Sequence, residues 1–364
     1  IASNDTITTV TVTGTATAQQ ALDIATLDAL TGVGTVTIAA VSDTALALSG
    51  ATNAALDLVT GTVTATTAAT AAQATALQVF TEAVVYSVSD TGANVVAQIA
   101  TNTNDNFLDD AVEVTLTGTS TVAQAAAAEA ATNSGTTTVE AIEDTAALLA
   151  GSSNAVLNLV SGTVTASTAA NAAEATTLQG FTEAVAYSAS DTAAAIAAQI
   201  TTNTNDSFLD DAVNITATGT GGANAADVSG ANAILGAANS GTKTIEEVRD
   251  TADQAALLSV GANETVSLLT VTDGAEDSEA VAIHALIGNG VTTASFSIED
   301  TGTNVAALTS GVLGSAENIT TTGAAISASD AGKILGASNS GTTTLSAVTG
   351  TAAQILALPI ASND

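Results

Sequence analysis

Two short loops carry the residues best suited to chemistry, and the second loop repeats the first. Their Asn and Asp residues are Asn104, Asp105, Asp109 and Asp110, and then Asn205, Asp206, Asp210 and Asp211. Such clusters suit Ca²⁺, a hard cation that takes about six to eight oxygen ligands. The spacing is not that of an EF-hand, and the glycine-rich nonapeptide of secreted calcium-binding β-rolls is missing from the sequence. We favour solvated turns, with Phe107 and Leu108 closing the end of a coil, and keep Ca²⁺ as a candidate cofactor of the two loops.

A second acidic pattern is an Asp-Thr step that returns about every 50 residues. It occurs at Asp43, Asp90, Asp144, Asp191, Asp250 and Asp300, and Gly350 holds the next place in the series. Each step follows a strand-like run and precedes an Ala-rich run. A side-chain oxygen there can accept a free N–H at the start of the helix, and a carboxylate also favours the positive end of the helix dipole. We expect helix caps, with a row of carboxylates that binds cations as the alternative.

The residues needed for catalysis are nearly absent from the sequence. His284 is the only histidine and lies in an apolar helical stretch, where a partly buried structural role is expected. Asp277 and Ser278 precede it in the same segment without a nucleophile motif. With no Cys and one His, an ordinary zinc site is excluded, and Lys243 lacks the upstream glycines of a phosphate-binding loop. We expect no enzyme.

Composition restricts the partners. The chain has 364 residues, of which 46% are hydrophobic and only 2% aromatic, and its formal net charge is −33. Three basic residues face 36 acidic ones, so binding to nucleic acid or to an anionic membrane surface is not expected. No run is long enough to span a bilayer. The absence of Cys, Met and Trp fits a durable extracellular material.

Internal repetition dominates the sequence. Residues 53–112 return at 154–213, and the motif Asn-Ser-Gly-Thr occurs at Asn133, Asn239 and Asn339. Runs that alternate β-branched and polar residues predict strands near positions 6, 35, 58, 83, 111, 136, 158, 183, 212, 242, 265, 291, 317 and 342. Ala-rich runs between them predict short helices. The spacing of about 26 residues is typical of a repeat protein with one strand and one helix per coil.

These patterns predict an α/β fold, a right-handed β/α solenoid of about 14 coils with a parallel sheet, and a parallel β-helix is the alternative. We expect one continuous solenoid over residues 1–364, with approximate super-repeats at 43–142, 143–248 and 249–348. Residues 349–364 would begin the next repeat or form an assembly segment. The chain opens with Ile-Ala-Ser-Asn-Asp and closes with the same five residues, which suggests tandem copies or end-to-end pairing.

Regular Thr-rich strand faces offer a second surface. Runs such as "TITTVTVT" place hydroxyls at every second residue, opposite the apolar side chains. Thr is also an ordinary exposed strand residue, so the array by itself is weak evidence for a ligand. It is similar to the Thr-rich faces of β-solenoid ice-binding proteins, which makes ice or glycan a candidate partner.

The segments "DTGANVVAQI", "DTAAAIAAQI" and "DTGTNVAAL" each follow an alternating strand. They resemble the Asp-Thr-Ala-Ala-Asn-Ile-Ala type tandem repeats of very large secreted bacterial surface proteins. The resemblance implies an exported, extracellular or cell-surface scaffold. We therefore expect a structural protein of an acidic filament or surface layer, whose partner is itself through self-assembly, with an ice- or glycan-binding adhesin as the alternative.

Overall fold

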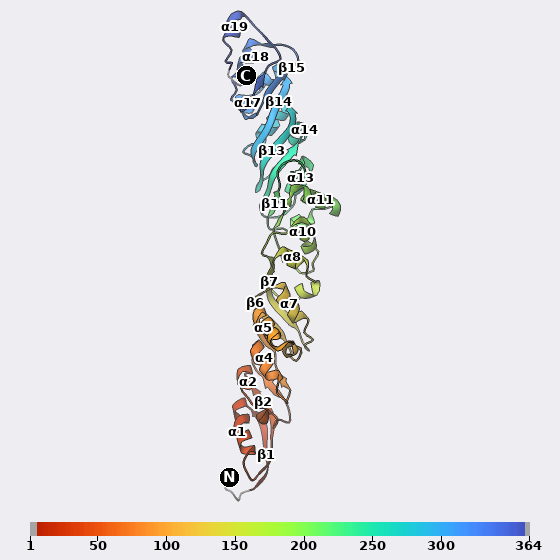
Figure 1. The fold of residues 1–364 in the computed structure, drawn as a ribbon, viewed down its shortest axis with the longest axis vertical. Coiled ribbons are helices and arrows are strands. Elements are labelled where there is room, and N and C mark those ends of the chain that lie inside the picture. The colour runs from red at the N-terminus through yellow and green to blue at the C-terminus, as the bar shows by residue number, and fades with distance from the viewer. Residues whose placement is uncertain (1–5, 361–364) are drawn as a thin grey trace. The chain divides into compact units, whose positions relative to one another are not determined.

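A computed structural model describes residues 6–360 as an α/β protein of repeated parallel β–α elements. Figure 1 follows this alternation along the chain from red to blue. The chain divides into a first unit, Ile1–Ser167 with Gly180–Val185, and a second unit, Thr168–Gln179 with Ala186–Asp364. The predicted α/β class and parallel strand–helix repetition are confirmed within each unit.

The strands form open parallel sheets. The four-stranded sheet is β1 (Ile7–Ala16), β2 (Val33–Asp43), β3 (Val63–Ala65) and β4 (Val84–Val85). The five-stranded sheet is β5 (Val88–Thr91), β6 (Val114–Ser120), β7 (Thr137–Asp144), β8 (Val164–Ala166) and β9 (Val185–Ala186). The seven-stranded sheet is β10 (Ala189–Thr192), β11 (Ile215–Thr218), β12 (Lys243–Asp250), β13 (Glu264–Ala275), β14 (Val291–Thr301), β15 (Ile319–Thr322) and β17 (Thr343–Thr344). The remaining pair is β16 (Ile326–Ser327) with β18 (Val348–Thr349).

Short helices connect the strands. In the first unit they are α1 (Ala18–Asp28), α2 (Ala45–Ser49), α3 (Asn53–Leu56), α4 (Ala71–Gln78), α5 (Gly92–Asn102), α6 (Asn106–Asp109), α7 (Val122–Glu129), α8 (Ala146–Ala150) and α9 (Asn154–Leu157). In the second unit they are α10 (Ala172–Gln179), α11 (Ala193–Asn203), α12 (Ser207–Asp210), α13 (Val228–Leu235), α14 (Ala252–Ala255), α15 (Asp277–Leu286), α16 (Gly302–Ala307), α17 (Ser310–Ser315), α18 (Ala328–Leu335) and α19 (Ala352–Leu356). None of these helices in the described residues has the length and apolar character required to cross a membrane.

The core is a set of stacked aliphatic columns. In the first sheet Val41, Val63 and Val84 pair in register, and all three are buried. The first helical residue after many caps is a buried alanine, which lets the helix approach the sheet closely because its side chain is small. These alanines include Ala45, Ala71, Ala146, Ala172, Ala252 and Ala328. Large aromatic side chains have little room in such a thin layer.

The glycine of each Asn-Ser-Gly-Thr turn has a packing reason. A Cβ on Gly135 would overlap the carbonyl oxygen of Val112 on the preceding coil, and one on Gly241 would overlap that of Val213. On Gly341 it would lie 2.6 Å from the carbonyl oxygen of Glu317. The motif therefore repeats because consecutive coils touch backbone to backbone at this turn.

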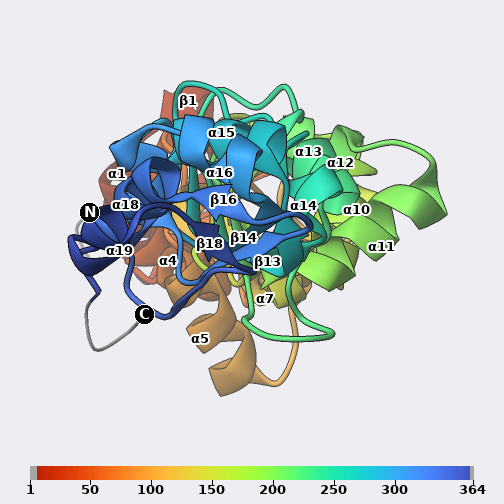
Figure 2. The ribbon, with the colours of Figure 1, turned by 90° about the horizontal axis from the view of Figure 1, so that it is seen from above.

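The sequence repeat at 53–112 and 154–213 is reproduced element by element. The buried hydroxyl of Tyr86 donates to the carbonyl of Phe107 at 2.9 Å, and that of Tyr187 donates to Phe208 at 2.7 Å. Each copy also has a helix of 11 residues, α5 or α11, that ends in a left-handed Thr. Figure 2 shows the far ends of α5 and of α11 extending past the neighbouring helices.

Most predicted strand positions agree with the observed strands, but those expected near 58 and 158 begin later. Thr52 and Ser153 cap the short helices α3 and α9 in these places, because their side chains accept backbone N–H groups. Val59 and Val160 make only single bridges to the preceding strands, and β3 and β8 follow.

Candidate functional site

The Asp of each Asp-Thr step bridges two consecutive coils. In Asp43, Oδ1 accepts the N–H of Thr44 at 2.8 Å, while Oδ2 accepts the N–H of Ala18, the first residue of α1, at 3.1 Å. The same carboxylate thus orders its own strand end and satisfies a free N–H of the preceding helix. Equivalent bonds to a preceding helix join Asp90 to Ala71, Asp144 to Val122, Asp191 to Ala172, Asp250 to Val228 and Asp300 to Asp277, at 3.0–3.2 Å.

The prediction that these aspartates cap their own helices is therefore wrong. The N-cap is the following Thr, as at Thr44, whose hydroxyl accepts the N–H of Ala47 at 3.2 Å. The preceding helix in each pair is capped separately, as in α1, where Thr17 and Gln20 form a capping box. Helices that begin with a capping box, or at α13 with the Asp227 cap, alternate with helices that follow an Asp-Thr step, so the step marks every second coil. One carboxylate departs from this order, because Asp273 Oδ1 accepts the N–H of Ala252 in α14 at 2.7 Å.

These carboxylates have no acidic neighbour on the adjacent strand, so a row of them would have one member in every second strand, and cation binding by such a row stays a prediction. Asp43 pairs in register with Ala65, Asp144 with Ala166 and Asp300 with Thr321, so the next strand offers no second carboxylate. Partial burial by itself acts to raise the pKa of Asp300, but hydrogen bonds from Thr301, Asp277 and Asn304 outweigh it and lower that pKa below its ordinary value. The ionised form is therefore the structural form.

The residues predicted to bind calcium lie in both copies of the loop, where they make hydrogen bonds to neighbouring residues or stand at the ends of short helices. Asp109 Oδ1 accepts the N–H of Thr132 at 2.7 Å, and Asp210 Oδ1 accepts that of Ala238 at 2.5 Å. Asn205 Oδ1 accepts the hydroxyl of Ser207 at 2.9 Å. The other members sit at the ends of the short helices: Asp105 and Asp206 are N-cap residues, and Asp110 and Asp211 are C-cap residues.

No three acidic, His or Cys side chains form a candidate metal cluster within residues 6–360. Asn104 and its neighbours therefore carry no observed ligand geometry, and Ca²⁺ binding at the two loops stays a prediction.

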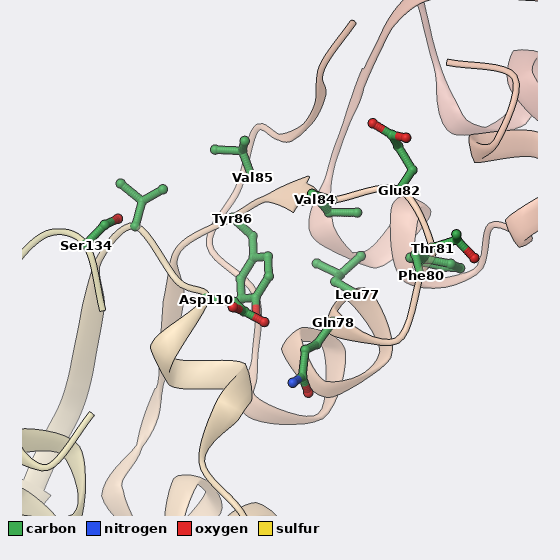
Figure 3. A pocket seen from close by; sticks show the side chains of 12 residues that line it. Leu77, Gln78, Phe80, Thr81, Glu82, Val84, Val85, Tyr86, Asp110 and Ser134 are labelled. Atoms are coloured by element: carbon green, nitrogen blue, oxygen red, sulfur yellow. The ribbon is translucent and has the colours of Figure 1, made fainter. Parts of the chain in front are cut away.

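A cavity of about 420 Å³ in the first unit adjoins one of these loops. Leu77, Phe80 and Val84 supply apolar lining, while Glu82 and Asp110 bring two carboxylates. Figure 3 shows the Tyr86 ring beside Asp110. Burial, with a smaller contribution from the Asp110 charge, raises the pKa of Tyr86 well above its ordinary value, so the phenol stays protonated. The lining contains no His, Cys or Lys that would act as nucleophile or base with these acids.

His284 links two helices. Its Nδ1 lies 3.0 Å from the hydroxyl oxygen of Ser315 in α17, and that hydroxyl donates to the carbonyl of Val312 at 2.8 Å. Asp277 and Ser278 lie at the opposite end of α15 and bond to each other, Ser278 N–H to Asp277 Oδ1 at 2.7 Å. The three residues do not form a triad.

Two buried charged side chains on β12 in the second unit were not predicted from the sequence. Lys243 is 8% exposed and its Nζ lies 3.0 Å from Glu264 Oε1. Glu247 is 3% exposed and accepts the hydroxyl of Thr270 at 2.7 Å. The signal was present, because Lys243 stands where the other two copies of the turn have Thr137 and Thr343.

Comparison with protein-family models gives no match, and a search of curated proteins finds no relative. Function therefore has to be argued from the contacts themselves.

We expect Asp144→Ala to lower the free energy of unfolding by about 2 kcal/mol, because the N–H groups of Val122 and Thr145 lose a charged acceptor. Urea denaturation measures this change. Asp57→Ala, at an exposed carboxylate that ends α3, is the control and should change stability by less than about 0.5 kcal/mol. Equal effects of the two substitutions would contradict the role given to the bridge.

The lowered pKa of Asp300 predicts acid sensitivity. In the unfolded chain an Asp carboxyl has a pKa of about 3.9. The ionised Asp300 therefore adds its full contribution to the free energy of unfolding above that pH, and the contribution is lost as the pH falls through the lower pKa of the folded state. We expect Asp300→Asn to be less stable than wild type at neutral pH and to lose less stability on acidification. Melting temperatures from about pH 6 to pH 2 test this, and parallel curves would contradict it.

Proposed function

We propose that the protein is a structural repeat module of an extracellular bacterial fibre or surface layer. Its coils would form one continuous right-handed β/α solenoid of about 14 turns, and further coils would stack on either end. The observation that supports this most directly is the repeated contact between coils: an Asp carboxylate of one coil accepts the first helical N–H of the preceding coil.

The last described helix looks like an interior helix that lacks its neighbour. The helix α19 buries none of its residues, whereas α2 and α8, of the same length, each bury an alanine and a leucine. Leu356 is 87% exposed and Ile360 is 69% exposed. A following coil with the same geometry would cover this apolar surface.

The first unit also has an open sheet edge, at β1. The strand β1 pairs with β2 alone in its sheet, which leaves backbone N–H and C=O groups along its other side. Ile7, Leu27 and Leu30 add exposed apolar side chains there, each about 40% exposed. The two edges offer complementary parallel-strand and helix surfaces, so the occupant we propose is another copy of this repeat, either in tandem or as a second molecule.

An extracellular or cell-surface location agrees with the composition. A chain without Cys, Met or Trp and with three basic residues resists oxidation and trypsin-like proteases. Its net charge of −33 would hold separate fibres apart and attract counter-ions, among which Ca²⁺ remains a candidate.

If copies stack end to end, the purified protein should form longer particles as its concentration rises, and Leu356→Asp should weaken this assembly at least tenfold by burying a charge in the contact. Sedimentation velocity and negative-stain electron microscopy provide the measurement. Leu46→Asp is the matched control, since Leu46 is 70% exposed on α2 within the first unit. A wild-type protein that stays monomeric at all concentrations would contradict self-assembly.

An ice- or glycan-binding adhesin is the second candidate, and one row of hydroxyls favours it. Ser190, Thr216, Thr244 and Thr265 pair in register across β10 to β13. Neighbouring strands lie about 4.8 Å apart, so the hydroxyls repeat at that spacing. A shorter row of Ser89, Thr115 and Thr138 crosses β5 to β7.

For this candidate we expect thermal hysteresis or binding on a glycan array, and Thr216→Lys should abolish it because a long side chain interrupts the row. Thr202→Lys, on the exposed side of α11, is the control and should bind like wild type. An inert wild-type protein would remove the adhesin from consideration.

A further inference from the structure

The Asn-Ser-Gly-Thr turn brings two side chains together at a fixed spacing. Asn133 Oδ1 accepts the hydroxyl of Thr137 at 3.1 Å, and Asn339 Oδ1 accepts that of Thr343 at 3.2 Å. The side chain four residues after the asparagine therefore lies against the asparagine amide. Both turns lead directly into a strand, β7 or β17.

In the third copy of this turn, before β12, a lysine takes the place four residues after the asparagine. Lys243 takes the position of the threonine, is 8% exposed, and donates from Nζ to the carbonyl of Leu235 and to Glu264 Oε1. Asn239 Oδ1 and Nδ2 are both buried and have no hydrogen-bond partner among the described residues. An amide left unsatisfied on both atoms is rare in a folded protein and calls for an explanation.

We propose that Lys243 and Asn239 become joined by an intramolecular isopeptide bond, with Glu264 as the catalytic proton acceptor. A buried amine, a carboxylate in contact with it and an unpartnered buried amide four residues earlier in the same turn are the three groups that this reaction requires. The register supports the assignment of Glu264, because Lys243 and Glu264 are direct partners across β12 and β13.

The reaction needs no external reagent. The Lys243 ammonium passes one proton to the Glu264 carboxylate, and the neutral Nζ attacks Asn239 Cγ to form the C–N bond. A second Nζ proton moves to Nδ2, the Cγ–Nδ2 bond breaks, and ammonia departs. Ammonia takes the proton held by Glu264 and leaves as ammonium, so the positive charge of Lys243 leaves with it.

The product would remove two costs at once. A cation would no longer be buried in the turn, and the asparagine amide would no longer lack partners. The covalent link would also fix the turn at the start of β12, the strand that carries the buried Glu247.

The intact mass of the purified full-length protein tests the proposal, since the bond removes ammonia and lowers the mass by about 17 Da. Digestion with trypsin then shows which lysine carries the modification that lowers the mass. The only possible sites of cleavage are Lys243, Arg249 and Lys333, and an acylated Lys243 is not cut. After denaturation we expect a fragment ending at Arg249, no fragment ending at Lys243, and normal cleavage at Lys333 as the internal control.

Three variants separate the chemistry from the fold. Glu264→Gln, Asn239→Ala and Lys243→Thr should each show the encoded mass, and Glu264→Gln and Asn239→Ala should regain cleavage at Lys243. Lys243→Thr restores the hydroxyl of the other two turns, so its circular dichroism should match wild type. The proposal is overturned by a wild-type protein of encoded mass that is cut at Lys243. It is equally overturned if a 17 Da loss maps elsewhere, for example to a succinimide at Asn289–Gly290.

Discussion

The carboxylate shared between consecutive coils is the contact on which the repeat depends. Helices of four to eleven residues consist largely of ends, so a high proportion of their N–H groups have no intrahelical partner. Asp43 and its equivalents supply an acceptor from the following coil, because the side chains at the start of the helix itself already cap other N–H groups, as in the capping box of α1 and the Asp227 cap of α13. This arrangement requires each strand to end beside the start of the preceding helix. It therefore fixes both the register of the strands and the length of the connections.

The close stacking of coils also requires small side chains where one coil meets the next. Where the coils meet, glycine at the Asn-Ser-Gly-Thr turn allows backbone contact, and alanine at the first helical position lets helices lie against the sheet. Two pairs of buried aromatic residues correspond between the copies: Tyr86 with Phe107, and Tyr187 with Phe208. These pairs belong to the same two copies as the 11-residue helices α5 and α11, so these large side chains follow the repeat. The buried Phe296 in β14 is a single exception.

Local patterns predicted local structure well. Alternating Val and Thr located most strands, and the Asp-Thr step marked helix starts because Thr is a strong N-cap. The bond between Asp43 and the N–H of Ala18 could not be predicted from the sequence. Ala18 lies 25 residues earlier, and only the stacking of coils brings the two residues together. Periodicity likewise could not show that Asn53 to Leu56 would form a helix. The Lys243–Glu264 pair could not be found from periodicity, because a single substitution in a repeat carries no period, and only alignment of the three Asn-Ser-Gly-Thr turns marks Lys243 as different.

The alternation of capping-box helices and bridging aspartates also bears on how such a gene changes. Every bridge connects a residue only to the coil beside it, so removing or duplicating one complete pair of coils leaves all remaining bridges with their partners. Adding or removing a single coil would instead place two bridging carboxylates on consecutive coils, an arrangement seen only around α14, where Asp250, Asp273 and Asp300 bridge successive helices of the described chain. The number of coils can therefore change by whole pairs with little effect on folding. A near-copy such as residues 154–213 is the sequence expected after such a duplication.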